Sequence, residues 1–414
     1  MTPCFAQRVT GVLLALLFAA AALSCASSRP ATRVEVIRAP IDDSRALPPT
    51  VITPIPDLTA VPPVIINPAT PPAEAPDAIE SPDPSQSIAD ELPPPVTSDV
   101  IALVLPLDVP AYERAAGAVR DGFLDAANAA GRSGTCIVIS HGNDGVISAF
   151  ETARAKGVRI VVGPLVRDDL KTLAISGVKL PWTLALNQLD DGSTLPGAIF
   201  SFPLTVESDG RVLAASALAS GARSVDVIAG DSPLMKRFAT SFALAWRNSG
   251  GRVPDALPFD AAPEALTGLR RTLNQHTPDA VLLAVSGERA ALVKPFIGGI
   301  RAYASGLVFE RPSPAVARDL DGVRVVEIPW LLTPDAPQFG GLPRRVFDST
   351  ALARLYALGL DAFRVAAAFE NGPPAQFDLE GATGRITLGP GRQFAREGKL
   401  AVYRNGELVP EAFP

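Results

Sequence analysis

The chain has 414 residues, of which 47% are hydrophobic and 19% charged, a composition that fits one large or two small globular domains. Its formal net charge is −6 and it has no run of five Lys or Arg residues, which argues against nucleic-acid binding because phosphates require clustered positive charge. Only two histidines and three cysteines are present, so we expect no His/Cys metal site and predict neither a metal nor a cofactor.

The N-terminus has the plan of an export signal. Arg8 precedes an apolar run from Val9 to Leu23, which is shorter than the roughly 20 residues of a membrane span. The run ends in Ala-Leu-Ser-Cys, which resembles a bacterial lipobox, although Leu23 stands where a small residue is usual. We predict a lipoprotein signal peptide over 1–24 and lipidation of Cys25; an ordinary cleaved signal is the alternative. Ala26, in place of an Asp, implies the outer membrane.

Residues 25–98 are predicted to comprise the lipidated cysteine and a proline-rich disordered tether. The segment from Arg29 to Ser98 contains many prolines and neither glycine nor an aromatic residue. Such a segment cannot pack a core and favours extended, polyproline-like conformations. Fully extended, it would reach roughly 220 Å, whereas a flexible coil would span about 45 Å. Two interpretations of the tether stay open: its length lets the folded part work far from the membrane, or it is a spacer whose length has not been selected.

From residue 99 onward, apolar strands alternate with amphipathic helices. Strands without polar alternation indicate parallel sheets that are covered on both faces, and residues 99–414 are long enough for two of them. The expected strands are Val100–Leu107, Cys136–Ser140, Val158–Val162, Trp182–Leu186, Ser224–Ala229, Val253–Phe259, Ala280–Val285 and Leu307–Phe309. The expected helices are Tyr112–Ala130, Val146–Lys156, Arg167–Ile175, Glu207–Ala219, Leu234–Asn248, Pro263–Gln275, Arg289–Ile297 and Leu352–Phe369, and short strands are expected within Arg385–Leu408.

Four loops of the first predicted sheet are candidates for lining a cleft. In open α/β sheets, ligands bind beyond the carboxyl ends of the strands, and these loops follow four of the strands. Loop position alone does not separate binding residues from ordinary turn residues, so both interpretations stay open. The candidate residues are Asp108, Tyr112, Ser140, His141, Asn143, Gly163, Pro164, Leu165, Asn187 and Gln188.

The sequence offers no convincing catalytic site. Ser232 lies between a strand and a helix, as a hydrolase nucleophile would, but neither His141 nor His276 has an Asp-x-x-His context. Ser232 is better explained as a helix N-cap, and Cys136 as a buried thiol in an apolar strand. Since no G-x-S-x-G, P-loop or G-x-G-x-x-G motif is present, we predict that the chain is not an enzyme.

Several segments carry a resemblance to known families. Ile101–Leu107, a following helix with Tyr112, and Val119–Phe123 together resemble the opening of type I periplasmic binding proteins. Within that fold the chain resembles the LppC family of outer-membrane lipoproteins, the LpoA-like penicillin-binding-protein activators. The segments that carry this second resemblance are Gly163–Leu165, Leu184–Gln188, Phe202–Leu204, Leu355–Ala362 and Gly381–Arg385.

The resemblance covers nearly all of 99–414 and implies a two-lobed α/β fold of the type I periplasmic-binding-protein kind. Each lobe would hold a mostly parallel sheet flanked by helices. The implied function is non-catalytic: the protein would face the periplasm from the outer membrane and bind and activate a bifunctional penicillin-binding protein in peptidoglycan synthesis. The helix around Tyr356 would be mostly buried, with Gly359 permitting close approach to a neighbouring strand.

Two features depart from the family pattern. The proline-rich tether stands where longer members have a helical-repeat region. Asp108-Val109 replaces the Ser-Gly that is usual after the first strand in ligand-binding relatives, so a small-molecule ligand stays unknown. The alternative function is a tethered periplasmic binding protein for amino-acid-like solutes, serving a transport system.

Overall fold

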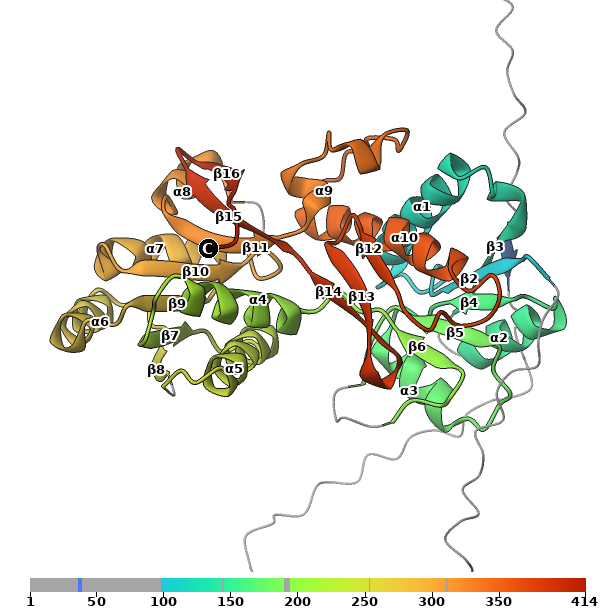
Figure 1. Cartoon of the computed structure of the whole chain (residues 1–414), viewed down its shortest axis with the longest axis horizontal. Helices are drawn as coiled ribbons and strands as arrows, with labels where there is room; N and C mark the ends of the chain where they lie inside the picture. The colour runs from blue at the N-terminus through green and yellow to red at the C-terminus, as the bar shows by residue number, and fades with distance from the viewer. Residues whose placement is uncertain (1–35, 39–97, 143–144, 190–193, 253, 310–311) are drawn as a thin grey trace, which may run out of the picture. The chain divides into compact units, whose positions relative to one another are not determined.

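The computed structural model describes residues 36–38, 98–142, 145–189, 194–252, 254–309 and 312–414 (Figure 1). The predicted signal peptide, Cys25, residues 39–97 of the tether and Asn143 lie outside these described residues. Within the described part, no helix is both long and apolar enough to cross a membrane.

The first sheet has nine strands in the order β1-β3-β2-β4-β5-β6-β14-β13-β12. Strands β1 to β6 are parallel to one another and β14 pairs in parallel with β6, whereas β13 is antiparallel to both β14 and β12. All five residues of β2 are buried, because helices cover both faces of the sheet. The strands are β1 (Val36–Arg38), β2 (Ile101–Leu105), β3 (Cys136–Ser140), β4 (Ile160–Val162), β5 (Trp182–Ala185), β6 (Ile199–Ser201), β12 (Asp378–Glu380), β13 (Arg385–Gly389) and β14 (Gln393–Glu397). Helical segments of this lobe are α1 (Glu113–Ala129), η1 (Ser133–Thr135), α2 (Val146–Ala155), α3 (Arg167–Ile175), α9 (Pro329–Leu332), η2 (Pro337–Phe339), α10 (Thr350–Ala367) and η3 (Pro390–Arg392).

The second sheet has seven strands in the order β16-β15-β11-β10-β9-β7-β8. The strands from β7 to β11 are parallel, and β15 and β16 are antiparallel to their neighbours. The strands are β7 (Val225–Ala229), β8 (Asp255–Pro258), β9 (Ala280–Ala284), β10 (Arg301–Ser305), β11 (Val323–Glu327), β15 (Lys399–Arg404) and β16 (Glu407–Pro410). The helices are α4 (Val206–Ala219), α5 (Pro233–Asn248), α6 (Pro263–His276), α7 (Gly287–Ile297) and α8 (Pro314–Asp319).

Both sheets share one strand order. Each sheet contains five parallel strands that follow one another in sequence, and in space the first of them lies between the second and the third. The spatial orders are β3-β2-β4-β5-β6 in the first sheet and β8-β7-β9-β10-β11 in the second. Each lobe also has its own apolar core, and α10 belongs to the core of the first lobe although it follows the second in sequence. The prediction of two mostly parallel sheets flanked by helices is confirmed.

The chain passes between the two sheets at three places. Residues 202–205 connect β6 to α4, Ile328 connects β11 to α9, and Gly398 connects β14 to β15. A Cβ atom at Gly398 would lie 2.6 Å from a methyl group of Val326, so the last crossing requires glycine. The crossing at Gly398 places β14 and β15, which are consecutive in sequence, in different sheets (Figure 1).

Most predicted elements are present with ends shifted by one or two residues. The strand expected at Leu307–Phe309 is wrong: the strand is Arg301–Ser305, and the apolar triplet forms a turn beside Gly306. Strands β6 and β11 were not predicted. Val36–Arg38 were predicted to belong to the disordered tether, yet they pair with β3 as β1.

Candidate functional site

The loops at the carboxyl ends of β2 and β3 are joined by their own polar groups. The Ser140 hydroxyl donates a hydrogen bond to the Asp108 carboxylate at 2.7 Å, and the Asp108 amide donates to the His141 carbonyl at 3.3 Å. Tyr112, at the start of α1, is exposed. The structure therefore brings Asp108, Ser140 and His141 together, as the shared sheet edge requires.

His141 is buried, with 1% of its surface exposed. Its Nδ1 lies 3.0 Å from the Gly142 carbonyl oxygen, and its Nε2 lies 3.8 Å from a carboxylate oxygen of Asp169 on α3. Burial raises the pKa of Asp169, and His141 opposes that rise. These contacts tie the loop after β3 to α3 and leave the imidazole little surface for a ligand.

The loops after β4 and β5 are also joined to each other. The Asn187 side-chain amide donates to the Leu165 carbonyl at 2.9 Å, and its oxygen accepts the Gln188 amide at the same distance. Gly163 has φ 121°, and a Cβ there would lie 2.2 Å from the Val104 carbonyl oxygen. Gly163 precedes a cis bond to Pro164. The polar groups of these predicted cleft residues thus have structural partners, and ligand binding by them stays a prediction.

Helices α1 and α10 pack through two glycines. A Cβ at Gly359 would lie 2.1 Å from the Val119 carbonyl oxygen, and one at Gly122 would lie 2.0 Å from the Tyr356 carbonyl oxygen. Close approach at Gly359 was predicted, but the neighbour is helix α1 and not a strand. Residues of both helices belong to the apolar core of the first lobe. Two segments that carry the family resemblance, one on each helix, therefore face each other.

A polar cluster lies at the solvent side of this helix pair. The Tyr356 hydroxyl donates to Asp125 at 2.8 Å, and the Arg345 guanidinium donates to the same carboxylate at 2.5 Å. Burial raises the pKa of the Tyr356 hydroxyl, and the hydrogen bond to Asp125 adds to the rise. Tyr356 itself is fully buried, as the apolar pattern of the helix predicts.

Asp361 of α10 binds Gly381–Arg385, another segment that carries the family resemblance. Its carboxylate accepts the Ala382 amide at 2.8 Å, the Thr383 amide at 2.6 Å and the Thr383 hydroxyl at 2.7 Å. Burial raises the pKa of this carboxyl, and Arg364 and the amide donors oppose the rise. The Leu355–Ala362 and Gly381–Arg385 segments are therefore bound to each other inside the first lobe.

Two buried ion pairs lie beside the crossings between the sheets. Arg354 of α10 donates to both carboxylate oxygens of Glu327, at 3.0 and 2.5 Å, next to the crossing at Ile328. Arg396 of β14 donates to Asp209 of α4 at 3.1 Å, next to the crossing at Gly398. Since breaking a buried pair leaves an uncompensated charge, these pairs hold the crossing segments in place.

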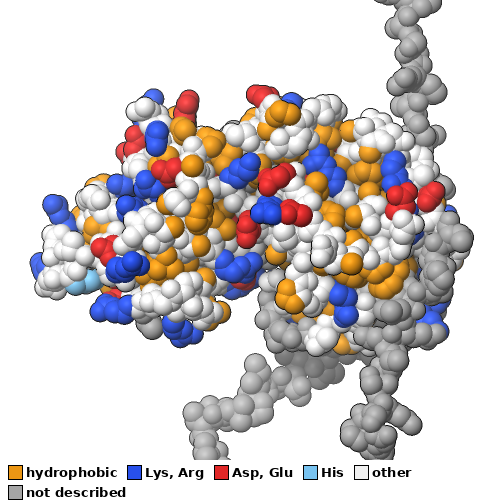
Figure 2. Space-filling model, viewed as in Figure 1, with side chains coloured by type: hydrophobic (Ala, Val, Ile, Leu, Met, Phe, Trp, Pro, Cys, Tyr) orange, Lys and Arg blue, Asp and Glu red, His pale blue; other side chains and the backbone are white. Residues whose placement is uncertain are grey.

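Two pockets lie near α9 and α10. One, of about 520 Å³, includes Trp330, whose ring lies 4.5 Å from the Arg344 guanidinium carbon, and Val346, which is 97% exposed. The other, of about 560 Å³, has Arg354 and Glu327 in its wall. Neither is lined by the predicted cleft residues. Figure 2 shows that hydrophobic and charged side chains are interspersed on the face of the molecule that it draws.

The candidate nucleophiles have structural roles. The Ser232 hydroxyl accepts the Met235 amide at 3.2 Å, which confirms it as the N-cap of α5. Cys136 is buried, as predicted, and burial raises the pKa of its thiol to about 11. The His276 Nε2 lies 2.7 Å from Asp226. This contact was not predicted, because the two residues lie far apart in sequence.

Comparison with known families gives one consistent match. The family model described as "LppC putative lipoprotein" matches residues 94–267 and 264–406. Among curated proteins, "Penicillin-binding protein activator LpoA" of Escherichia coli K12 is 28% identical over 300 residues, which cover 61% of this chain and 44% of that protein. The protein of the same name from Edwardsiella ictaluri is 26% identical over 306 residues. The chain thus matches less than half the length of these relatives.

Solved structures show the same fold. Full-length LpoA from Haemophilus influenzae superposes with a TM-score of 0.64 at 22% identity, covering 77% of this chain and 59% of that one. A protein from Chromobacterium violaceum, described as "a putative branched-chain amino acid ABC transporter", superposes with a TM-score of 0.62 at 29% identity, covering 73% of this chain and 99% of that one. Both neighbours support the two-lobed architecture seen here.

Proposed function

The chain belongs to the LppC lipoprotein family, and from that premise we propose that it binds and activates a penicillin-binding protein as a non-catalytic lipoprotein of the outer membrane. The observation that carries the proposal is the family match over both lobes, together with relatives that are named activators of penicillin-binding proteins. The C-domain of the Haemophilus influenzae relative is described as a regulator of PBP1A, which supports a bifunctional synthase as partner.

The lack of catalysis is supported by how the reactive side chains are used. Ser232 caps a helix, and the Cys136 thiol is buried inside the first sheet. Among the described residues, His141 contacts Gly142 and Asp169, and His276 contacts Asp226, so both imidazoles have partners other than a serine hydroxyl. A serine hydrolase needs a contact between a histidine and the serine hydroxyl.

The anchor and tether complete the proposal. Lipidation of Cys25 would hold the chain at the outer membrane, and the proline-rich segment that follows would carry the two lobes toward a synthase in the inner membrane. The lobes themselves would supply the binding surface, because they contain nearly all of the family match.

Reconstitution with a bifunctional penicillin-binding protein of the same organism tests the proposal. We expect the purified chain to bind the synthase in a pull-down and to raise its rate of glycan polymerisation or cross-linking from lipid II. A monofunctional penicillin-binding protein serves as the partner control, and heat-unfolded chain as the protein control. Absence of both binding and stimulation with the folded chain would refute the proposed function.

A solute-binding role is the second candidate, and one observation favours it. The superposition covers 99% of the Chromobacterium violaceum protein, which is described as "a putative branched-chain amino acid ABC transporter". The strand-end residues weigh against it, because Ser140, Asp108 and Asn187 already have hydrogen-bond partners within the lobe. Thermal melts of the chain with single amino acids decide: a reproducible rise in melting temperature with one amino acid would favour the solute-binding role.

A further inference from the structure

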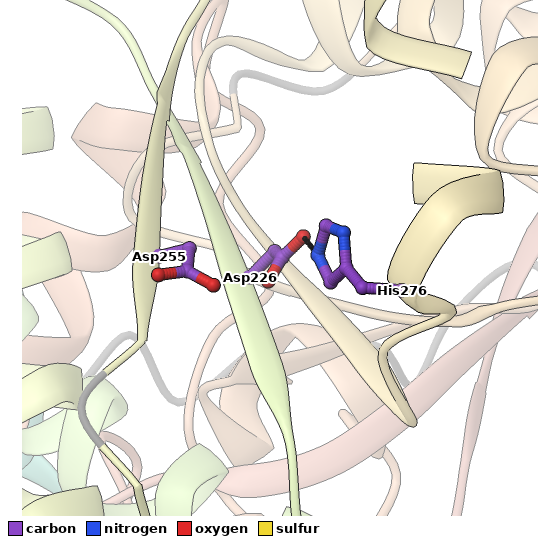
Figure 3. Close-up of side chains that lie close together, drawn as sticks. All are labelled: Asp226, Asp255 and His276. Atoms are coloured by element: carbon purple, nitrogen blue, oxygen red, sulfur yellow. Dashed lines mark hydrogen bonds and ion pairs between the residues drawn. The ribbon is translucent and has the colours of Figure 1, made fainter. Parts of the chain in front are cut away.

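Three potential metal ligands meet at one edge of the second sheet (Figure 3). Asp226 is the second residue of β7, Asp255 is the first residue of β8, and His276 is the last residue of α6. The two aspartates are direct partners in the parallel pairing of β7 with β8. One ligand atom from each of the three residues lies within 4.8 Å of the others. Residues far apart in sequence thus converge on one small volume.

Two carboxylates of this cluster lie on paired strands and could share one cation. Asp226 is 2% exposed in an otherwise apolar strand, and its carboxylate lies 2.7 Å from the His276 Nε2. The Asp255 carboxylate stands on the adjacent strand, and carboxylates directly opposite each other repel. The nearby Arg252 binds Asp255 at 3.0 Å from the solvent side. A divalent ion between the carboxylates would neutralise both at once.

We propose that Asp226, Asp255 and His276 bind a divalent transition-metal ion of the zinc type, with water as the remaining ligand. One imidazole nitrogen and two carboxylate oxygens are donors that zinc takes in proteins, usually in a four-coordinate arrangement. Magnesium and calcium prefer all-oxygen sets, so the imidazole favours zinc over them. Coordination uses the lone pair of the ring nitrogen that faces Asp226, so that atom must carry no proton in the metal complex.

The geometry needs only a small adjustment. Ligand atoms of a tetrahedral zinc site lie about 3.3 Å apart, given metal–ligand distances of ~2.0–2.2 Å. The Asp226–His276 pair is already at 2.7 Å, and the other separations reach at most 4.8 Å. The Asp255 side chain is 54% exposed on an edge strand, so it has room to rotate inward. Asp226 is therefore fixed by packing, His276 is held beside it by their hydrogen bond, and Asp255 is adjustable.

The ion would join three elements. Strand β8 is the edge of the second sheet and is mostly exposed, while β7 is an inner strand. A metal held by β7, β8 and the last residue of α6 would fasten the edge strand to the inner strand and to the helix. The site lies at the amino ends of β7 and β8, away from the carboxyl ends where a cleft ligand is expected, and does not depend on the proposed function.

Zinc titration of the purified full chain, first treated with a chelator, tests the proposal. We expect one ion per chain by calorimetry and a zinc-dependent rise in melting temperature. Asp255→Asn and His276→Gln should each weaken binding by at least about tenfold, equivalent to ~1.4 kcal/mol. Asp231→Asn is the matched control, because it removes an exposed carboxylate from the same lobe, and it should bind like wild type.

Arg252→Ala gives a test with the opposite sign. Removing the guanidinium that holds Asp255 should tighten zinc binding, which non-specific binding would not reproduce. Cobalt in place of zinc should give the visible absorption of a tetrahedral nitrogen–oxygen site in wild type and lose it in His276→Gln. No zinc binding by wild type, or equal binding by wild type, Asp255→Asn and His276→Gln, would overturn the proposal.

Discussion

The sharpest test of the first lobe's packing is Gly359→Ala in α10. An alanine Cβ would lie 2.1 Å from the Val119 carbonyl oxygen and 2.9 Å from the Phe123 amide nitrogen. Since relaxed contacts lie near 3.5 Å, the helices would have to separate by roughly 1 Å or more. Overpacking of this kind costs up to ~3 kcal/mol. Alanine recovers ~1 kcal/mol through helix propensity, which leaves a net loss of about 2 kcal/mol.

Gly117→Ala is the matched control because it makes the same change on α1. A Cβ there would meet only the Arg120 guanidinium, at 4.0 Å. Without a clash, alanine should raise the free energy of unfolding by about 0.5–1 kcal/mol. Urea unfolding followed by circular dichroism measures both variants. If Gly359→Ala is as stable as Gly117→Ala, the close contact between α1 and α10 does not exist as described.

Four further predictions concern other parts of the chain. Arg354→Ala should cost ~3–5 kcal/mol because it leaves the buried Glu327 carboxylate without its partner, whereas Arg385→Ala, in an exposed pair, should change stability far less in the same unfolding assay. Cys25→Ala should abolish labelling by radioactive palmitate and release the chain from the membrane fraction; unchanged labelling would contradict lipidation. The Cys136 thiol, with a pKa of about 11, should react with iodoacetamide at pH 8 only when urea unfolds the chain. Backbone amides lower the pKa of Asp279 in the folded chain, so its stabilisation is present above the unfolded pKa of ~3.9 and is lost as pH falls through the folded value; Asp279→Asn should melt with less pH dependence in that range.

Most of the uniformly apolar strands could be predicted from the sequence, but Arg301–Ser305, of mixed composition, could not. Ile101–Leu105 is uniformly apolar and was identified. Arg301–Ser305 alternates polar and small residues, yet it is an inner strand, because Arg301 reaches the Ser220 carbonyl and Ser305 binds the buried Asp209. Leu307–Phe309 looked like a strand, but apolar residues can also fill a core from a turn, as Val308 and Phe309 do.

The candidate sites were less predictable, because they depend on which strands pair. The small number of histidines and cysteines argued against a metal site, but carboxylates were not considered as metal ligands. Asp226 and Asp255 become neighbours only through the register of β7 with β8, which the sequence does not specify. For the predicted cleft residues, strand order placed the loops together correctly, but the hydrogen bonds between Ser140 and Asp108 depend on side-chain geometry.

The family resemblance of this chain is carried mainly by packing residues, and this limits what mutagenesis of those residues can say about partner binding. Gly359 contacts α1, Asp361 binds the Gly381–Arg385 segment, and Gly163 approaches β2. All three are buried, so a partner cannot touch them directly. A surface that binds a synthase must instead use exposed residues, such as Val346 in the loop before α10. Loss of activation in a variant of a buried residue would therefore report unfolding, and only variants that melt like the wild type can locate the contact surface.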